Sequence, residues 1–111
     1  MIMKIDVNDS DFDKEVVEKS KQIPVLVDFW APWCGPCLML SPVIEQAIDC
    51  DEFRKKVLLA KANTNECRNN AAKYNIMAIP NVKLFKNGRI VAEMVGFRPL
   101  EAIRDWLRSN L

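Results

Sequence analysis

The sequence predicts an α/β domain with parallel strands in its first half and an antiparallel strand pair in its second half. Strand-like apolar runs alternate with helical patterns up to residue 62, an order that favours parallel pairing through right-handed crossovers. Asn87-Gly88 lies between two further strand-like runs and is the strongest short signal for a hairpin. The run from Val25 to Trp30 is almost wholly apolar, as expected of a central strand covered on both faces.

The first elements follow from capping residues and periodicity. Met1 to Ile5 is a short candidate strand. Asn8 or Asp9 can cap the next helix, which is expected to end near residues 20–22. The apolar face of this helix consists of Phe12, Val16 and Val17. The central strand follows, with Asp28 as its one polar interruption.

The remaining elements are predicted in the same way. A helix begins at Gly35, and Pro42 inside it is expected to kink its axis. Residues 57–62 form a third strand, and a short helix is expected from residues 64–66 through Tyr74. The hairpin strands are residues 81–85 and 89–95. Pro99 opens a closing helix, whose apolar face is Leu100, Ile103 and Leu107.

Length and composition fit one domain spanning residues 1–111. A chain of 111 residues that is 50% hydrophobic can build one packed core. Its 16 Lys and Arg residues balance 15 Asp and Glu residues, so no strong field is present to recruit nucleic acid or a membrane surface. The start has no apolar run of signal-peptide length, and no stretch is long enough for a membrane span. We therefore expect a cytoplasmic protein, acting as a monomer.

The four cysteines, at positions 34, 37, 50 and 67, carry most of the reactive chemistry. In a reducing cytosol a cysteine pair is more often catalytic or metal-bound than a structural disulfide. A tetrahedral zinc site needs four ligands, whereas this chain has no histidine and its last two cysteines lack paired spacing. Metal binding would require a dimer, and we predict neither a metal nor another cofactor. Cys50 and Cys67 are interpreted as small apolar residues, although the first turn of a helix could favour a Cys67 thiolate open to regulatory oxidation.

The segment Cys34-Gly35-Pro36-Cys37 follows the central strand and opens a helix. Unpaired N–H groups and the positive end of the helix dipole stabilise a thiolate at the first position, so Cys34 is the predicted nucleophile. Cys37 lies within bonding reach and can attack a mixed disulfide formed at Cys34, which releases the product. Gly35 and Pro36 suit a tight, preset start to the helix.

Cys37 is less favoured as a thiolate and needs a base. Asp28 is the best candidate, because a carboxyl in an apolar strand is costly to ionise and its raised pKa would let it exchange protons near neutral pH. Asp28 could instead be a buried polar residue with satisfied hydrogen bonds and no part in proton transfer.

The segment from Val27 to Cys37, VDFWAPWCGPC, resembles the active-site segment of the thioredoxin family. Matching segments elsewhere, at matching intervals, are Ala60-Lys61, Ile79-Pro80, Leu84 to Gly88 and Val95-Gly96. The resemblance covers essentially the whole chain, and its longest segment is far more specific than a lone Cys-x-x-Cys. It implies a thioredoxin fold, with a central mixed five-stranded sheet flanked by four helices.

The resemblance also implies a catalytic site with parts from distant segments. Lys61 is expected near buried Asp28, unless it is only a solvated lysine at the end of a strand. Pro80 is expected in a cis peptide beside the cysteines, where Ile79 can present its backbone to an extended substrate peptide. The implied substrate-binding residues are Trp33, Gly35, Pro36, Ile79, Pro80 and Gly96. Reducing electrons would come from a thioredoxin reductase.

The sequence therefore predicts an enzyme, a thiol-disulfide oxidoreductase that reduces protein disulfides with Cys34 as nucleophile and Cys37 as resolving thiol. Disulfide-containing proteins are its expected substrates. A scaffold subunit that uses the same groove without turning over electrons is the alternative. An oxidase or isomerase is a further alternative, because proteins of this fold catalyse thiol-disulfide exchange in either direction, depending on the reduction potential of the cysteine pair.

Overall fold

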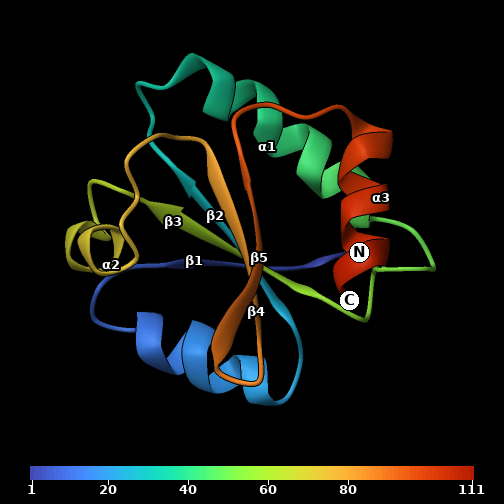
Figure 1. Cartoon of the computed structure of the whole chain (residues 1–111), viewed down its shortest axis with the longest axis horizontal. Helices are drawn as coiled ribbons and strands as arrows, with labels where there is room; N and C mark the ends of the chain where they lie inside the picture. Colours follow the sequence, from blue (N-terminus) through green and yellow to red (C-terminus); the bar gives the residue numbers. More distant parts are fainter.

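The computed structural model describes residues 1–111 and contains one mixed five-stranded sheet with helices on both of its faces (Figure 1). The strands are β1 (Met3–Val7), β2 (Val25–Trp30), β3 (Leu58–Asn63), β4 (Asn81–Lys86) and β5 (Arg89–Val95). The helices are η1 (Asp13–Glu18), η2 (Lys19–Lys21), α1 (Gly35–Ile48), α2 (Arg68–Lys73) and α3 (Leu100–Asn110). η1 has π-helical geometry and continues directly into the 3₁₀ turn of η2. The five predicted strands and four helical segments are thereby confirmed.

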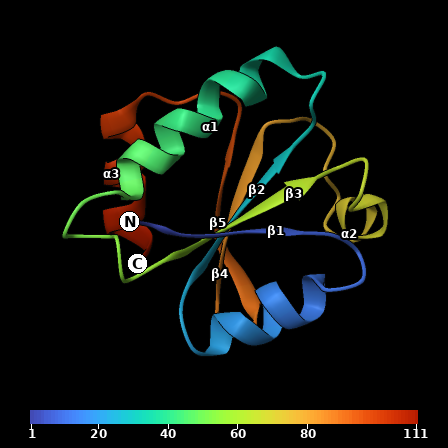
Figure 2. The ribbon, with the colours of Figure 1, turned by 180° about the vertical axis from the view of Figure 1, so that it is seen from behind.

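The strand order in the sheet is β1-β3-β2-β4-β5. β1 and β2 run parallel to β3, whereas β4 is antiparallel to both β2 and β5, so the predicted change from parallel to antiparallel pairing is confirmed. The β5 edge faces the viewer in Figure 1, and the β1 edge does so in Figure 2. Asn87 and Gly88 connect β4 to β5 with φ of 54° and 85°, as a two-residue hairpin turn requires. β1 begins at Met3, two residues later than predicted.

The hydrophobic core lies in two layers, one on each face of the sheet. Alternate residues of β2 point to opposite faces: Leu26 packs against α1 and α3, whereas Val27 and Phe29 pack against the layer that holds Phe12. The first layer is built around Leu26, Leu40, Ile44, Leu59, Val82, Leu84, Ile103 and Leu107. Asp28 follows Leu26 by two residues and therefore faces the α1 side of the sheet.

Three helix starts differ from the prediction. The first helical segment begins at Asp13 after Phe12, which makes no side-chain capping hydrogen bond, so the expected cap at Asn8 is wrong. Asn8 Oδ1 instead accepts the Ser10 N–H at 2.8 Å in the turn before this segment. Asp9 instead caps α2, because its carboxylate accepts the backbone N–H groups of Asn69 and Asn70 at 2.9 and 3.0 Å. α2 begins at Arg68, later than the predicted residues 64–66, since these residues form a turn after β3. The capping residue of α2 comes from a segment about 60 residues away, which local capping rules do not reveal.

The closing helix begins one residue later than predicted. Pro99 has an extended ψ of 163° and precedes α3, while its carbonyl accepts the Ile103 N–H at 3.1 Å. None of the helices has the length and apolar character needed to cross a membrane.

Candidate active site

α1 begins directly after Cys34, as predicted from the position of the motif. Cys34 has extended dihedrals and is the capping residue of the helix. The Cys37 N–H donates a hydrogen bond to Cys34 Sγ at 3.2 Å. The first sulfur therefore receives one of the free N–H groups of the helix start and lies at the positive end of the helix dipole. Both effects favour a thiolate at Cys34 over a thiol.

Cys34 and Cys37 form a disulfide, with their Cα atoms 5.3 Å apart. The Cys34 residue is 7% exposed and Cys37 is 1% exposed. The two residues form a small cluster with Ala31, against which Trp30 and Ile79 pack. Cys34 is therefore the sulfur that a macromolecule can reach from outside, and Cys37 lies behind it.

A second chain segment lies beside the disulfide. The Ile79–Pro80 peptide is cis, as the resemblance implies, and the Ile79 carbonyl oxygen is 3.9 Å from Cys34 Sγ. Pro80 itself is buried, and its carbonyl accepts the Gly96 N–H at 2.8 Å. Gly96 is partly buried and has a positive φ of 84°, a region that favours glycine. The segments before β4 and after β5 thus meet next to the cysteines.

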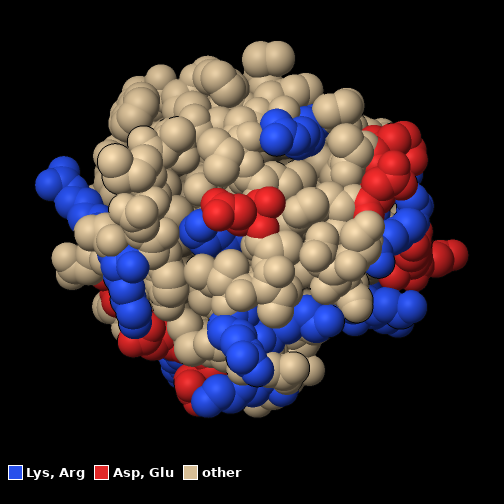
Figure 3. Space-filling view, viewed as in Figure 1, with Lys and Arg blue, Asp and Glu red and all other residues tan.

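The surface around these segments is mainly apolar. Trp33 is 71% exposed and Met77 is 85% exposed, and Gly35 and Pro36 are exposed as well. A pocket of about 190 Å³ is lined by Trp33, Thr64, Ala71, Ile76, Met77, Ala78 and Ile79. Charged side chains are sparse on the upper part of the face in Figure 3, over the start of α1 and the β2–α1 connection. The place of Met77 on this surface could not be predicted from the sequence, because an exposed methionine between two elements has no periodic signal.

Asp28 and Lys61 form a buried ion pair on the α1 side of the sheet. They are opposite one another in the parallel pair of β2 and β3, and Lys61 Nζ donates to Asp28 Oδ2 at 2.9 Å. Lys61 also donates to Ser41 Oγ and lies 5.2 Å from the centroid of the Trp30 ring. The interpretation of Lys61 as a solvated lysine at a strand end is therefore wrong, since its side chain is 9% exposed.

The pKa of the Asp28 carboxyl is raised above its ordinary value. Burial is the largest cause, the positive charge and hydrogen bond of Lys61 oppose it, and the negative charge of Glu45 adds to the rise. A carboxyl of this kind holds its proton at a higher pH than an exposed aspartate does, so it can accept and return a proton closer to neutral pH.

The two other cysteines are unpaired and lie apart from this cluster. Cys67 is fully buried, and its thiol donates to the Val7 carbonyl at 3.2 Å. Burial, together with the negative charges of nearby carboxylates, raises its pKa to about 12. The hypothesis of a reactive Cys67 thiolate is therefore wrong, because the residue lies inside the core rather than in an open first turn. Cys50 is partly buried, and its thiol lies 3.7 Å from the Ala47 carbonyl.

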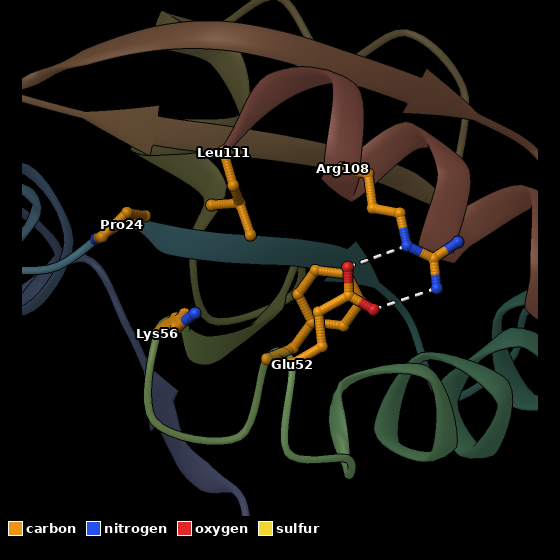
Figure 4. A pocket seen from close by; sticks show the side chains of 6 residues that line it. Pro24, Glu52, Lys56, Arg108 and Leu111 are labelled. Carbon is orange, nitrogen blue, oxygen red and sulfur yellow. Dashed lines mark hydrogen bonds and ion pairs between the residues drawn. The ribbon is translucent and has the colours of Figure 1, made fainter.

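The largest pocket, of about 430 Å³, contains no cysteine and lies between α3 and the loop after α1 (Figure 4). Its lining residues are Pro24, Glu52, Phe53, Lys56, Arg108 and Leu111. Arg108 donates two hydrogen bonds to the Glu52 carboxylate, at 2.8 and 2.9 Å. These charges satisfy one another, so the pocket offers no group for the thiol chemistry described above.

Comparisons with known proteins agree with this geometry. The model of the family described as Thioredoxin matches residues 3–109. The thioredoxin of Rickettsia felis is 41% identical over 109 residues, which cover 98% of this chain and 100% of the relative. The thioredoxin of Chlorobaculum thiosulfatiphilum is 44% identical over 106 residues, 96% of this chain and 94% of that protein. A chloroplastic M-type thioredoxin of Pisum sativum is 46% identical over 99 residues, 89% of this chain and 55% of the relative.

Proposed function

Because this chain belongs to the thioredoxin family and is a thiol-disulfide oxidoreductase, we propose that it works as a reductant of protein disulfides in the cytoplasm. One observation supports the proposal most directly: the Cys34–Cys37 pair begins α1, and the Cys37 N–H donates to Cys34 Sγ. A thiolate stabilised in this way is both a nucleophile and a good leaving group. Members of the family act on disulfide-containing proteins and are themselves reduced by reductases.

The reaction proceeds as two successive exchanges. In the first, the Cys34 thiolate attacks one sulfur of the substrate disulfide, that bond breaks, and one substrate sulfur leaves as a thiolate. In the second, Asp28 takes the proton of Cys37, whose thiolate attacks the Cys34 sulfur. The Cys34–Cys37 disulfide forms and the second substrate sulfur leaves as a thiolate. The proton held by Asp28 then passes to that thiolate. Two electrons have moved from the dithiol to the substrate, and we propose that a thioredoxin reductase returns them.

The substrate is proposed to lie across the segments beside Cys34. The backbone of Ile79, 3.9 Å from Cys34 Sγ through its carbonyl oxygen, would pair with an extended stretch of substrate. Trp33, Gly35 and Pro36 would contact the stretch on the α1 side of the disulfide, and Pro80 and Gly96 would shape the other side. The exposed area of Trp33 favours substrates with apolar residues near the disulfide.

The proposed setting is a reducing compartment. Cys50 and Cys67 remain as free thiols in a chain whose other two cysteines form a disulfide, which suits a cytoplasm where unpaired thiols are kept reduced. One copy of the chain holds both cysteines and the Asp28–Lys61 pair. We therefore propose that residues 1–111 act as a single domain and as a monomer.

Insulin reduction tests the proposed function against a scaffold role. Catalytic amounts of the protein are expected to accelerate the precipitation of the insulin B chain well above the rate with dithiothreitol alone, because the Cys34 thiolate is regenerated in every cycle. The measurement is turbidity at neutral pH. A rate equal to that of dithiothreitol alone would favour a scaffold that does not turn over, and an equilibrium with glutathione that leaves the pair mostly reduced would favour an oxidase.

The substitution Asp28→Asn is expected to slow the second exchange by about 10²-fold at neutral pH, because Cys37 loses its base. In the wild type this step should slow as the pH falls through the raised pKa of Asp28, since the protonated carboxyl cannot accept a proton. In Asp28→Asn that acid limb should disappear. The measurement is the slow, concentration-independent release of the second thionitrobenzoate when the reduced protein reacts with Ellman's reagent between pH 5 and 9.

The first, bimolecular release of thionitrobenzoate serves as the internal control, because it reports the attack by Cys34 itself. Asp51→Asn is the matched control variant, since the Asp51 carboxylate is fully exposed and pairs with Arg54. An Asp28→Asn protein whose second phase keeps the rate and pH profile of the wild type would rule out Asp28 as the base.

A further inference from the structure

We propose that Ser41 is a positioning residue for the second exchange: its hydroxyl holds the Lys61 ammonium against Asp28 and so controls how readily Cys37 is deprotonated. The inference rests on the proposed role of Asp28 and deepens it. Ser41 lies outside the Cys34-Gly35-Pro36-Cys37 motif, and its link to the site is its contact with Lys61.

Ser41 connects the helix that carries Cys37 to the strand that carries Asp28. It lies in α1 one helical turn after Cys37, and residues at this spacing share one face of a helix. Lys61 Nζ donates to Ser41 Oγ on one side and to Asp28 Oδ2 on the other. A single ammonium group thus bridges α1 and β2.

The Asp28 carboxylate depends on this one ammonium. Its Oδ1 is buried and has no hydrogen-bond partner, and its Oδ2 receives its hydrogen bond from Lys61. A buried carboxylate with few donors ionises only as far as its counter-charge allows. Any change that moves the ammonium away from Asp28 therefore shifts the carboxyl toward its protonated form.

Lys61 also has a route away from Asp28. A pocket of about 240 Å³ is lined by Lys61 together with Asp6 of β1 and Glu66 of the turn after β3, so negative groups and solvent are available on that side. Glu45 of α1 raises the pKa of Asp28 and is itself bound to Lys4 of β1 at 3.2 Å. The Ser41 hydroxyl is the contact from α1 that keeps the ammonium on the Asp28 side.

The expected effect of Ser41→Ala follows from the loss of this acceptor. Lys61 should spend more time toward Asp6 and Glu66, and a larger fraction of Asp28 should then be protonated near neutral pH. The second exchange should become slower at pH 6, on the order of threefold, as expected for the partial loss of a hydrogen bond to a charged group. As the pH rises and the carboxyl becomes ionised in both proteins, the two rates should converge.

Three variants separate the hydroxyl from other effects of substitution. Ser41→Ala removes the hydroxyl, and Ser41→Thr keeps it. Ser109→Ala is the matched control, because Ser109 also lies inside a helix but is exposed and bonds only to the Asp105 carbonyl. Each reduced protein is studied by the second thionitrobenzoate release across pH 5 to 9, and by titration of the Asp28 carboxyl carbon by ¹³C NMR, which requires no turnover.

In Ser41→Ala both the acid limb of the rate and the NMR titration of Asp28 should move to higher pH, while Ser41→Thr and Ser109→Ala should follow the wild type. Profiles of Ser41→Ala that coincide with the wild type or move to lower pH would overturn the proposal, as would a Ser41→Thr protein that behaves like Ser41→Ala. A wild type whose second exchange shows no acid limb would instead overturn the base role of Asp28, and with it the catalytic role of Ser41. A wild type that shows the limb, with the limb of Ser41→Ala at the same pH, would overturn the role of Ser41 alone.

Discussion

Cys34→Ser is expected to reduce the rate of insulin reduction to that of dithiothreitol alone. A serine hydroxyl at this position can still accept the Cys37 N–H, because serine is a favoured capping residue, so α1 should keep its start. The hydroxyl cannot form the mixed disulfide on which both exchanges depend. The prediction is therefore a complete loss of turnover with the fold retained, measured by insulin turbidity alongside circular dichroism.

Two further cysteine variants sharpen this test. Cys50→Ser should keep the activity of the wild type, because Cys50 lies outside the disulfide cluster. Cys37→Ser should keep the nucleophile but lose the resolving thiol, so it should accumulate as a mixed disulfide with its substrates that dithiothreitol releases. Turnover by Cys34→Ser, or trapping by Cys34→Ser as efficient as by Cys37→Ser, would contradict the assignment of Cys34 as the nucleophile.

Phe12→Ala is expected to lower the free energy of unfolding by about 3–5 kcal/mol, the usual cost of truncating a buried phenylalanine. Phe12 is fully buried, and its ring centroid lies 6.0 Å from that of Phe29, 5.7 Å from Tyr74 and 6.1 Å from Phe85. The ring thereby joins the segment before η1 to β2, β4 and the end of α2. The cavity left by alanine would be shared by all four, so little of it can close.

Urea unfolding followed by tryptophan fluorescence measures this effect. Phe97→Ala is the matched control, because Phe97 is 41% exposed and its loss should change the free energy of unfolding by only about 0.5 kcal/mol. A Phe12→Ala protein destabilised by less than about 1 kcal/mol would show that the η1 side of the core repacks readily.

The reacting centre could be predicted from local sequence because its geometry is local. Cys34 and Cys37 lie within one helical turn that follows a buried strand, so their spacing alone places the sulfurs together and the free N–H groups beside the first of them. The same holds for the Asn87-Gly88 turn, whose two positive φ angles these residue types tolerate.

The groups around the reacting centre could not be predicted in this way. Lys61 is 33 residues from Asp28 and became a candidate only through the family resemblance. In the sequence Ser41 is only one polar position on a helix, and nothing there indicates its contact with Lys61. The sequence predicts Asp9 as a cap for the helix that follows it, whereas its carboxylate caps α2. Each of these contacts depends on the register of two strands or the placement of a helix over the sheet, which no local pattern specifies.

The amino-acid sequence by itself determined the order of strands and helices, the change from parallel to antiparallel pairing, and the start of α1 at the reactive cysteine, since these depend on periodicity, turn residues and helix capping. The tertiary structure alone decided that Cys67 is buried and unreactive, that Pro80 is buried while Met77 is exposed, and that Lys61 bridges Asp28 and Ser41. The physical reason is that burial and ionisation depend on neighbours brought together by folding from segments distant along the chain.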